Sequence, residues 1–465
     1  MNSLLNIELK KVSNLDPGFV PAAVWNKAYR KLVGQQAGSV KFKMCLEQPN
    51  GIKHTISEKI LPHTGEFQAL NIKFVERQLK AMLWMVGGSR IHMAADHDLF
   101  DAIKEIYSAT GVRSFDNELI GQKVYDEDLQ FIQCELSQVP ESASNSLSIG
   151  GYTDGCRIGF DLGGSDRKCS ATIDGKVVHT EEVGWHPYFQ EDPQWHIDGI
   201  NDSLKRAAAK LPRVDAIGGS AAGVYVDSQV KIASLFRGVS EENFNSTVKD
   251  IFYTIQKEWD VPMIVVNDGD VTALNGAQSI GVTPCMGLAM GTSEAVGYVD
   301  EDSKITGGLN ELAFAPVDYR ENGPIDEWSG DEGCGVQCFS QQAVARLAPI
   351  AGLNYPEDMT FADRLIEVQN LMKEGDQRAR DIYETIGLYL GYTIPHYAEF
   401  YEMDNLLILG RVTSGEGGEI ILEKAREVLD LEFPDLSKIV NFHIPNEQDK
   451  RHGQAVTAAS LAPIA

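Results

Sequence analysis

The sequence predicts an α/β protein in which strands and helices alternate. Three strand–turn segments support this class, because each is an apolar run that leads into glycine; they lie at 158–165, 287–293 and 406–411. Other apolar runs alternate between the two-residue period of strands and the spacing of amphipathic helices. Alternation of this kind favours sheets that are covered by helices.

Composition and charge limit the function classes. Of the 465 residues, 43% are hydrophobic and 23% are charged, as in ordinary globular proteins with more than one domain. The formal net charge of −26 argues against nucleic-acid binding, because phosphate backbones attract Lys and Arg. No apolar run is long enough to span a membrane, and the N-terminus lacks a signal-peptide pattern. Seven scattered cysteines, an odd number, indicate a reducing cytoplasm rather than a disulfide framework.

Residues 1–145 are expected to form a small accessory α/β domain. The expected strands lie at 40–46, 54–60, 90–95 and 129–136, and the expected helices at 74–86 and 99–109. This order lacks the consecutive short helices and the basic recognition helix of a DNA-binding module. The small polar segment Val139–Ser146 is interpreted as a linker to the rest of the chain.

The first glycine segment has the features of a phosphate-binding turn. Gly163 and Gly164 leave the backbone open, so that its N–H groups can face phosphate oxygens. Ser165 adds a hydroxyl group, and Lys168 follows in the same segment. Asp161 ends an apolar strand and could hold Mg²⁺ through water. The alternative is a plain β-hairpin turn with a solvated aspartate.

Asn267 and Asp268 follow the apolar strand 263–266. A carboxylate at the end of a buried strand can accept the proton of a hydroxyl group that attacks phosphorus. Asp270 is expected to cap a helix that begins near Val271. Helix capping is also the alternative role for Asp268.

Gly291, Thr292 and Ser293 follow the strand 287–290 and could form a second phosphate-binding turn. An ordinary turn is the alternative. The next residue, Glu294, would repel the phosphates of a nucleotide if its carboxylate faced them.

Gly410 and Arg411 open a glycine-rich loop between the strand 406–409 and a helix expected at 419–429. A glycine loop that leads into a helix can bind an anion or lie against a nucleotide. A long helix is expected just before this segment, at 376–397.

In this order, the segments resemble the ROK family of sugar kinases and regulators, within the actin-like ATPase superfamily. The resemblance covers about residues 155–465. It implies a two-lobed actin-like (ribonuclease H-like) fold after the accessory domain, with lobes at 155–265 and 266–465. It also implies a homodimer.

The resemblance assigns roles to the segments. The turns that contain Asp161 and Gly291 are similar to the two phosphate motifs of the family, and the Gly410 loop is similar to its adenosine motif. The resemblance thus implies that ATP and Mg²⁺ bind. It also implies that Asp268 is the catalytic base and that Asn267 forms a hydrogen bond with the sugar.

Two departures from the family pattern stand out. Glu311 matches a family glutamate, but Phe314 stands where the family has a histidine. Only Cys334 and Cys338 remain of the family's cysteine-rich zinc signature. A structural zinc ion normally takes four Cys or His ligands, so the sequence predicts no zinc at this segment.

The missing histidine and a missing glutamate of the zinc signature remove sugar contacts of the family, so an unusual sugar or replacement contacts are expected. The aromatic segment 184–196 could stack on a sugar ring; the alternative is that it packs on its own lobe. Ser220, in a glycine-rich loop, is a further candidate for a sugar contact.

The sequence therefore predicts a transferase: an ATP-dependent carbohydrate kinase that phosphorylates a hydroxyl group of a sugar or amino sugar. The alternative is a non-catalytic regulator that senses a sugar or nucleotide on the same scaffold. Turnover distinguishes the two.

Overall fold

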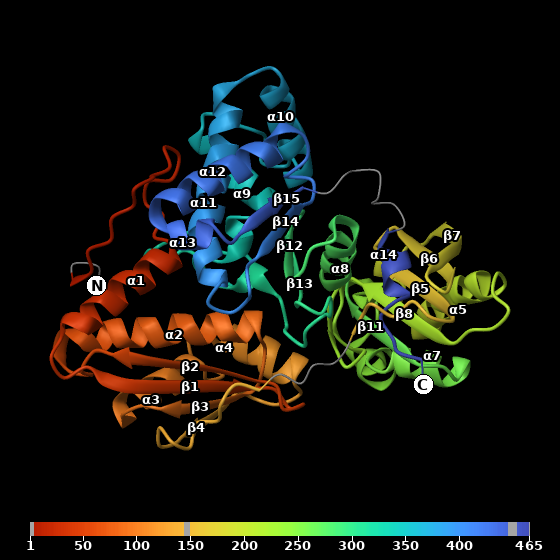
Figure 1. The fold of residues 1–465 in the computed structure, drawn as a ribbon, viewed down its shortest axis with the longest axis horizontal. Coiled ribbons are helices and arrows are strands. Elements are labelled where there is room, and N and C mark those ends of the chain that lie inside the picture. Colours follow the sequence, from red (N-terminus) through yellow and green to blue (C-terminus); the bar gives the residue numbers. More distant parts are fainter. Residues whose placement is uncertain (1–3, 144–148, 445–452, 465) are drawn as a thin grey trace. The chain divides into compact units, whose positions relative to one another are not determined.

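The structure is a computed structural model and describes residues 4–143, 149–444 and 453–464 (Figure 1). The chain divides into two compact units. The first unit comprises residues 1–145, 288–296 and 307–444, and the second comprises residues 146–287, 297–306 and 445–465. No helix in the described ranges is long and apolar enough to cross a membrane.

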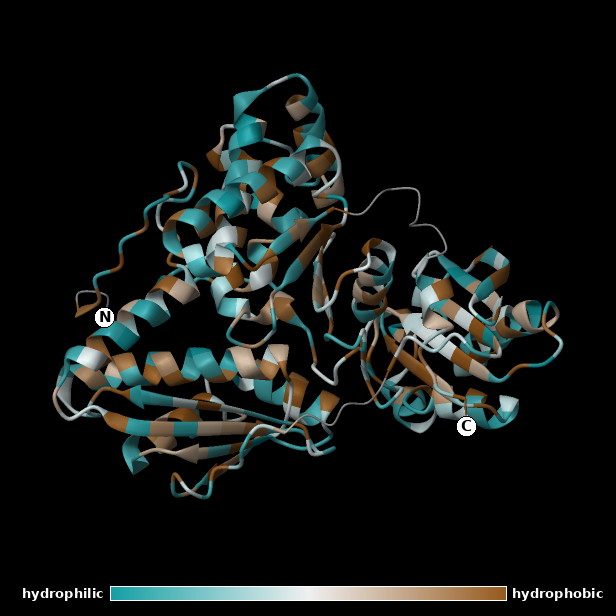
Figure 2. Cartoon of the chain, in the orientation of Figure 1, coloured by the Kyte–Doolittle hydropathy of each residue, from teal (hydrophilic) through white to brown (hydrophobic). Residues whose placement is uncertain are grey.

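The N-terminal part of the first unit is a four-stranded sheet with helices. Its elements are α1 (Ala22–Gln35), β1 (Val40–Glu47), β2 (Lys53–Ile60), η2 (Gly65–Phe67), α2 (Gln68–Met85), β3 (Arg90–Ala94), α3 (His97–Ile106), α4 (Ser114–Asp116), η3 (Asn117–Val124) and β4 (Gln130–Gln133). The strand order is β2-β1-β3-β4. Phe42, Met44 and Leu46 alternate along β1 and are fully buried. Apolar and polar stretches alternate along α2 in Figure 2, yet every residue from Phe74 to Met85 is buried, so this helix is covered on all sides.

The remainder of the first unit contains a second sheet of order β13-β12-β14-β15. Its elements are β12 (Cys285–Met290), β13 (Glu294–Val299), η7 (Leu312–Phe314), η8 (Gly335–Gln337), α9 (Gln341–Ile350), α10 (Phe361–Lys373), α11 (Gln377–Tyr397), β14 (Asn405–Leu409), α12 (Glu416–Glu432), α13 (Pro434–Ser437) and β15 (Asn441–His443). Helices α11 and α12 pack closely, because a Cβ atom on Gly391 would lie 2.6 Å from Val428 Cβ. The predicted long helix is α11.

The second unit is built on a five-stranded sheet of order β11-β8-β5-β6-β7. Its elements are β5 (Cys156–Leu162), β6 (Asp166–Ile173), β7 (Lys176–Gly184), η4 (Pro187–Phe189), α5 (Pro193–Ala208), β8 (Ala216–Ala221), β9 (Val224–Val226), β10 (Gln229–Ile232), η5 (Ser234–Phe236), α6 (Glu241–Asn243), η6 (Phe244–Val248), α7 (Ile251–Trp259), β11 (Met263–Asn267), α8 (Asp268–Ile280) and α14 (Gly453–Ala458). Strands β5, β8 and β11 are parallel, whereas β5, β6 and β7 form an antiparallel meander. The turn between β6 and β7 has positive φ angles at Asp174 (46°) and Gly175 (76°), as hairpin turns require.

The boundaries of the units differ from the predicted lobes. Helix α8 and the described C-terminal residues 453–464 belong to the unit of the first predicted lobe. The C-terminal helix α14 packs on β5 and β6, where Ser170 Oγ donates a hydrogen bond to Ala455 O (2.8 Å). The first predicted lobe therefore contains a segment from the end of the chain, which local sequence patterns do not indicate.

The predicted linker is structured over its described residues. Val139 is 4% exposed and packs beside Cys45, and Ala143 pairs with Lys53. The segment from Val139 to Ala143 therefore covers the first sheet instead of connecting domains freely. The last residues of the predicted linker, 144–146, lie outside the described residues.

Candidate active site

Asp161 lies near the end of β5, a strand whose residues are all buried. The sheet register places Asp161 opposite Ser220 on β8 and opposite Lys168 on β6. Ser220 Oγ donates a hydrogen bond to Asp161 Oδ1 (2.7 Å), and Lys168 Nζ lies 3.4 Å from Asp161 Oδ2. Burial raises the pKa of Asp161 above its ordinary value, although Ser220 and Lys168 oppose this shift. Lys168 also pairs with Asp166 (2.8 Å).

The first glycine turn is in contact with two aromatic side chains, Trp185 and Tyr188. Trp185 Nε1 donates a hydrogen bond to Gly163 O (2.8 Å), and Gly163 N donates to Asp166 O (3.0 Å). A Cβ atom on Gly164 would collide with the ring end of Tyr188, so a larger residue there would have to displace that side chain. Ser165 is exposed. Its hydroxyl group donates a hydrogen bond to Asp166 Oδ2 (2.9 Å).

The aromatic segment after β7 packs mainly on its own unit. Trp185 is 4% exposed and stacks on Trp195 with ring centroids 5.7 Å apart. His196 is fully buried and lies against Phe236 (4.9 Å). These residues form part of the core under the glycine turn, so the packing interpretation is correct for them and the sugar-stacking interpretation is wrong.

Asn267 caps helix α8, and Asp268 is the first residue of that helix. Asn267 Oδ1 accepts a hydrogen bond from Gly269 N (2.6 Å), and Asn267 Nδ2 donates to Gly223 O (2.7 Å). The predicted cap at Asp270 is therefore wrong: Asp270 lies inside the helix and is 7% exposed. The cap fixes the direction in which the chain leaves the strand, and this places Asp268 at the sheet edge.

The carboxyl group of Asp268 has an unusual acidity. Its pKa is raised to about 6, first by burial and then by the negative charge of Asp161, while backbone N–H groups at the helix start oppose the shift. Asp268 in turn contributes to the raised pKa of the partly buried Tyr225. Asp161 and Asp268 therefore interact electrostatically.

One sheet edge gathers the predicted residues of this unit. In the parallel register, Leu162 pairs with Ala221 and Ala221 pairs with Asn267. The carboxyl ends of β5, β8 and β11 therefore coincide, which places Asp161, Ser220, Asn267 and Asp268 at one edge. Such edges are the usual ligand sites of parallel α/β sheets.

The first unit carries the second glycine turn. Gly291 N donates a hydrogen bond to Ser293 O (2.9 Å), which closes a tight turn, and Thr292 and Ser293 are exposed. Glu294 does not face this turn. Its side chain is buried, and its Oε1 atom lies 3.4 Å from the hydroxyl group of Tyr397.

Burial raises the pKa of Glu294 to about 8, and the charge of Glu311 adds to the shift. The predicted repulsion between Glu294 and phosphates at the turn therefore does not arise from this side chain. Glu294 is the first residue of β13, and its side chain lies on the buried side of that strand.

The Gly410 loop lies against the end of β12. Gly410 has a φ angle of 99°, and a Cβ atom there would lie 2.5 Å from Met290 O. Val412 N donates a hydrogen bond to the same Met290 O (3.1 Å). The loop therefore stands beside the turn that begins at Gly291. Arg411 is exposed, and its carbonyl oxygen accepts a hydrogen bond from Gln369 (2.8 Å).

Phe314, which replaces the family histidine, belongs to an aromatic cluster with Trp84, Phe115 and Trp328. Its ring centroid lies 4.5 Å from that of Trp84, 6.1 Å from that of Phe115 and 5.2 Å from that of Trp328. The backbone N–H of Glu311 donates to Trp84 O (2.9 Å). The N-terminal part of the chain thus packs directly onto the segment that carries Glu311 and Phe314.

Cys334 and Cys338 are buried free thiols. Cys334 Sγ lies 3.9 Å from the carbonyl oxygen of Asp331, whose carboxylate pairs with Lys80 (3.0 Å). Charged and aromatic contacts with the N-terminal part surround this segment.

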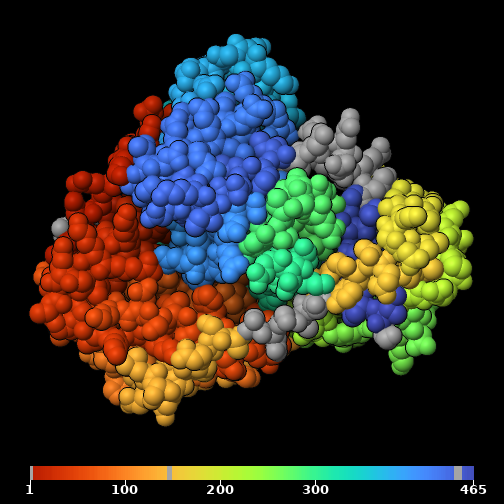
Figure 3. Space-filling model, viewed as in Figure 1, coloured from red at the N-terminus to blue at the C-terminus, as the bar shows by residue number. Residues whose placement is uncertain are grey.

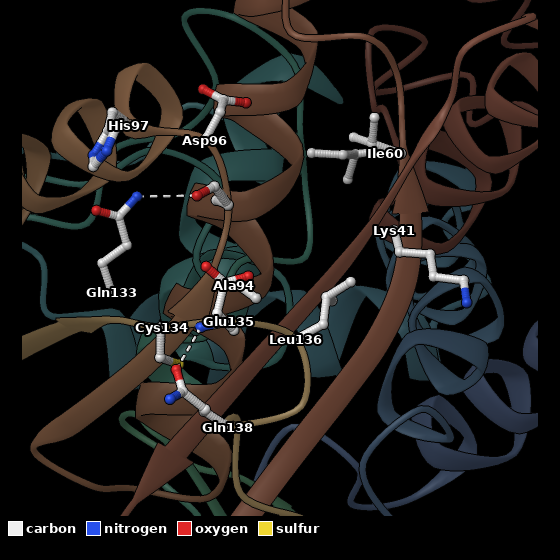
Figure 4. Close-up of a pocket in the computed structure, with 12 residues that line it drawn as sticks. Lys41, Ile60, Ala94, Asp96, His97, Gln133, Cys134, Glu135, Leu136 and Gln138 are labelled. Carbon is white, nitrogen blue, oxygen red and sulfur yellow. Dashed lines mark hydrogen bonds between the residues drawn. The ribbon is translucent and has the colours of Figure 1, made fainter.

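A pocket of about 620 Å³, which the sequence patterns did not indicate, lies at one end of the first sheet (Figure 4). Gln133 Nε2 donates a hydrogen bond to Ala95 O (3.0 Å) at its wall. Its lining includes Lys41 and His97 as well as the acidic residues Asp96 and Glu135. The mixed charges do not select a class of ligand.

No protein-family model matches the sequence, and no curated protein matches it. Solved structures do match. The ROK hexokinase from Thermus thermophilus has 17% sequence identity and a TM-score of 0.52, over 65% of this chain and 96% of its own. A ROK family transcriptional regulator, a homolog of the E. coli MLC protein, has 17% identity and a TM-score of 0.50, over 84% of this chain and 95% of its own.

This chain has the ROK fold. The predicted actin-like α/β fold is thereby confirmed, and so is the resemblance to ROK proteins at the level of the fold. The alignment with the regulator extends over more of this chain than the alignment with the hexokinase does.

Proposed function

We propose that this protein is a ROK sugar kinase that uses ATP to phosphorylate a hydroxyl group of a sugar or amino sugar. The observation that carries the proposal is the carboxyl group of Asp268. It lies at the edge where β5, β8 and β11 end, and its pKa is raised to about 6. Such a group is mostly ionised at neutral pH, yet it is basic enough to accept a proton from an attacking hydroxyl group.

Asn267 and Ser220 act beside this base. Asn267 Nδ2 donates one N–H to Gly223 O, and its second N–H remains to bind a sugar oxygen. The Ser220 hydroxyl group is committed to Asp161, which makes Ser220 a positioning residue in this proposal rather than a sugar contact. Glu311 remains a proposed sugar contact.

The residues around Asp161 suit a divalent cation. Asp161, Asp166 and Asp268 bring more negative charge than Lys168 balances. Burial raises the pKa values of Asp161 and Asp268, and a neighbouring carboxylate adds to each shift: Asp166 for Asp161, and Asp161 for Asp268. Oxygen ligands of this kind are those that Mg²⁺ prefers. Bound Mg²⁺ would neutralise phosphate charge, while Ser220 and Lys168 hold the Asp161 carboxylate in place.

We propose that residues of the two glycine turns and of the Gly410 loop contact the nucleotide. They comprise Gly163, Gly164, Ser165, Lys168, Gly291, Thr292, Ser293, Gly410 and Arg411. At Gly291 a Cβ atom would meet nothing closer than Ser293 O at 3.5 Å, so there is space for a ligand beside this residue. Gly291 N already donates to Ser293 O, and the exposed residues of the turn are Thr292 and Ser293. Main-chain N–H groups in such turns are typical partners of phosphate oxygens.

A second candidate function is a non-catalytic regulator that binds a sugar or nucleotide. Two observations favour it: the regulator aligns with 84% of this chain, and Phe314 occupies the position of the family histidine. Such a protein would retain ligand binding without turnover.

An ADP-release assay tests the proposal. Mg-ATP is supplied with a panel of hexoses, N-acylhexosamines and anhydro sugars, using the wild type, Asp268→Asn, and Asp198→Asn as a matched control at an exposed carboxylate of α5 in the same unit. We expect sugar-dependent ADP release that Asp268→Asn abolishes and the control keeps. Folded protein that binds a panel sugar, detected by a raised melting temperature, but releases no ADP would favour the regulator instead.

A further inference from the structure

The hairpin of β6 and β7 holds three side chains of metal-binding type outside the candidate active site. They are Cys169, His179 and Glu181, whose ligand atoms all lie within 4.8 Å of one another. Cys169 pairs directly with Glu181 across the ladder, and Ala171 pairs with His179. Because side chains alternate along strands, the three groups share one face of the hairpin. The small side chain of Ala171 leaves room beside the imidazole.

The spacing is compatible with a tetrahedral ion. Zinc bonds of about 2.0–2.3 Å at tetrahedral angles place neighbouring ligand atoms about 3.3–3.6 Å apart. His179 Nε2 and Glu181 Oε2 are already 3.4 Å apart. Cys169 Sγ lies within 4.8 Å of the other two ligand atoms, so small side-chain movements would bring it to the spacing of a zinc ligand.

An outer set of charged groups fixes the carboxylate of Glu181. Arg206 Nη1 donates a hydrogen bond to Glu181 Oε1 (2.9 Å), which leaves Oε2 directed toward His179. Arg206 Nε in turn donates to Asp202 Oδ2 (2.8 Å), and Arg167 donates to the same oxygen (2.5 Å). Partners of this kind orient metal ligands in known sites.

We propose that Cys169, His179 and Glu181 bind one Zn²⁺ ion, with water as the fourth ligand. Thiolate, imidazole and carboxylate form a ligand set that zinc accepts, and the two negative charges balance the ion. Burial raises the pKa of Cys169 to about 11, so binding releases the thiol proton to solvent. The proposal does not depend on the proposed kinase function.

The position of this site suggests what the ion does. Cys169 directly follows Lys168, and successive residues of a strand face opposite sides, so the ion lies on the face of β6 away from Asp161. It joins the edge strand β7 to β6, whose first residues follow the glycine turn. Figure 3 shows this part of the chain, in yellow, at the surface of its unit. The ion would therefore stabilise the hairpin behind the turn.

The test measures metal binding on the full chain. Zn²⁺ is titrated into the metal-free protein, and equilibrium dialysis gives the number of ions bound per chain. In a separate experiment, Co²⁺ is added to detect a cobalt–thiolate charge-transfer band. The melting temperature is recorded with and without Zn²⁺. The variants are Cys169→Ser and His179→Gln. The matched controls are Cys134→Ser and His97→Gln, and Cys334→Ser reports on the two-cysteine segment.

We expect one ion per wild-type chain, a thiolate band, and a melting temperature that rises with Zn²⁺. Cys169→Ser and His179→Gln are expected to weaken binding by at least about tenfold and to lose the rise in melting temperature, whereas the three other variants keep both. Absence of stoichiometric binding in the wild type would overturn the proposal. Binding that survives Cys169→Ser but is lost in Cys334→Ser would also overturn it.

Discussion

Asp268 and Glu294 both have raised pKa values, but their surroundings give them different roles. Asp268 is partly exposed at a sheet edge and lies beside Asp161. Glu294 is buried, and its Oε2 atom has no hydrogen-bond partner among the described residues. The first acid is available to a ligand, whereas the second one weakens the fold whenever it ionises.

Activity is expected to depend on the ionisation of Asp268. A pKa of about 6 means that the group loses its basic form as the pH falls below 6. We expect kcat/KM to decrease about tenfold per pH unit below that value, and Asp268→Asn to reduce it by about 100-fold or more at neutral pH. A pH–rate profile of the wild type checks this. A flat profile between pH 5 and pH 7 would contradict the assignment of Asp268 as the base.

Glu294 should make stability depend on pH in the opposite sense to an ordinary paired carboxylate. The unfolded chain ionises this group near 4.5, whereas the folded chain keeps it protonated up to about pH 8. The unfolded state therefore binds fewer protons in this window, and stability falls as the pH rises. We expect the free energy of unfolding of Glu294→Gln minus that of the wild type to increase with pH, by up to about 1.4 kcal/mol per pH unit across this window.

Urea denaturation of the two proteins at several pH values measures this difference. The wild type provides the reference at each pH, so the titration of all other groups cancels. Parallel stability curves would show that Glu294 ionises freely in the folded state.

At the scale of elements, substitutions at two glycines are expected to have different effects, one on stability and the other on nucleotide binding. A Cβ atom on Gly410 would press on the Met290 backbone and would require a φ angle of 99°, whereas Gly291 has room for a Cβ atom. We expect Gly410→Ala to lower stability by about 1–3 kcal/mol, and Gly291→Ala to leave the melting temperature nearly unchanged while raising KM for ATP. Thermal melts and ATP titrations check both. A Gly291→Ala variant with unchanged KM would exclude this backbone from the phosphate contacts.

Elements with a clear local signal could be predicted from the sequence. Strand alternation located β1 and β2, and helical spacing located α11 and α12. Helix α1 was missed because it begins after Pro21 without a capping side chain. The start of α8 was misplaced because both Asn267 and Asp270 are good capping residues, and only the three-dimensional path of the chain after β11 selects the first.

Part of the candidate site could also be predicted, because some of its residues have a clear local signal in the sequence. Asp161 and Asp268 end apolar strands, and this position is visible in the sequence. The contacts of Trp185 and Tyr188 with the first glycine turn, and the inward direction of Glu294, depend on how strands and loops pack. No local pattern encodes that packing.

At the scale of the molecule, a buried ion cluster attaches the N-terminal part to a distant loop of its unit. Lys80 Nζ lies 2.9 Å from Asp116 Oδ1 and 3.0 Å from Asp331 Oδ2, and the three side chains are almost fully buried. Residues 1–145 therefore share one compact unit with residues 307–444. Charges so far apart in the sequence cannot be paired by inspection, which is why this attachment was not predicted.

Loss of the central lysine should be costly. Lys80→Met leaves the buried carboxylate of Asp116 without its cation, whereas Asp331 still pairs with Arg77 and Arg113. We expect the substitution to reduce the free energy of unfolding by about 3–5 kcal/mol. The control Lys123→Met removes an exposed pair with Glu118 and should cost less than about 1 kcal/mol. Chemical denaturation measures both. Equal effects would mean that the cluster does not hold the parts together.

The same cluster has a consequence for synthesis on the ribosome. Lys80 can pair with Asp116 inside the nascent N-terminal segment, but Asp331, its second carboxylate, and Phe314, which packs on Trp84, leave the exit tunnel much later. The nascent N-terminal segment must therefore wait, with Trp84 incompletely covered and the ion cluster of Lys80 incomplete, until most of the chain has been translated. A pause in translation before that loop emerges would prolong the exposure and favour aggregation, so the first third of this protein depends on its last third to finish folding.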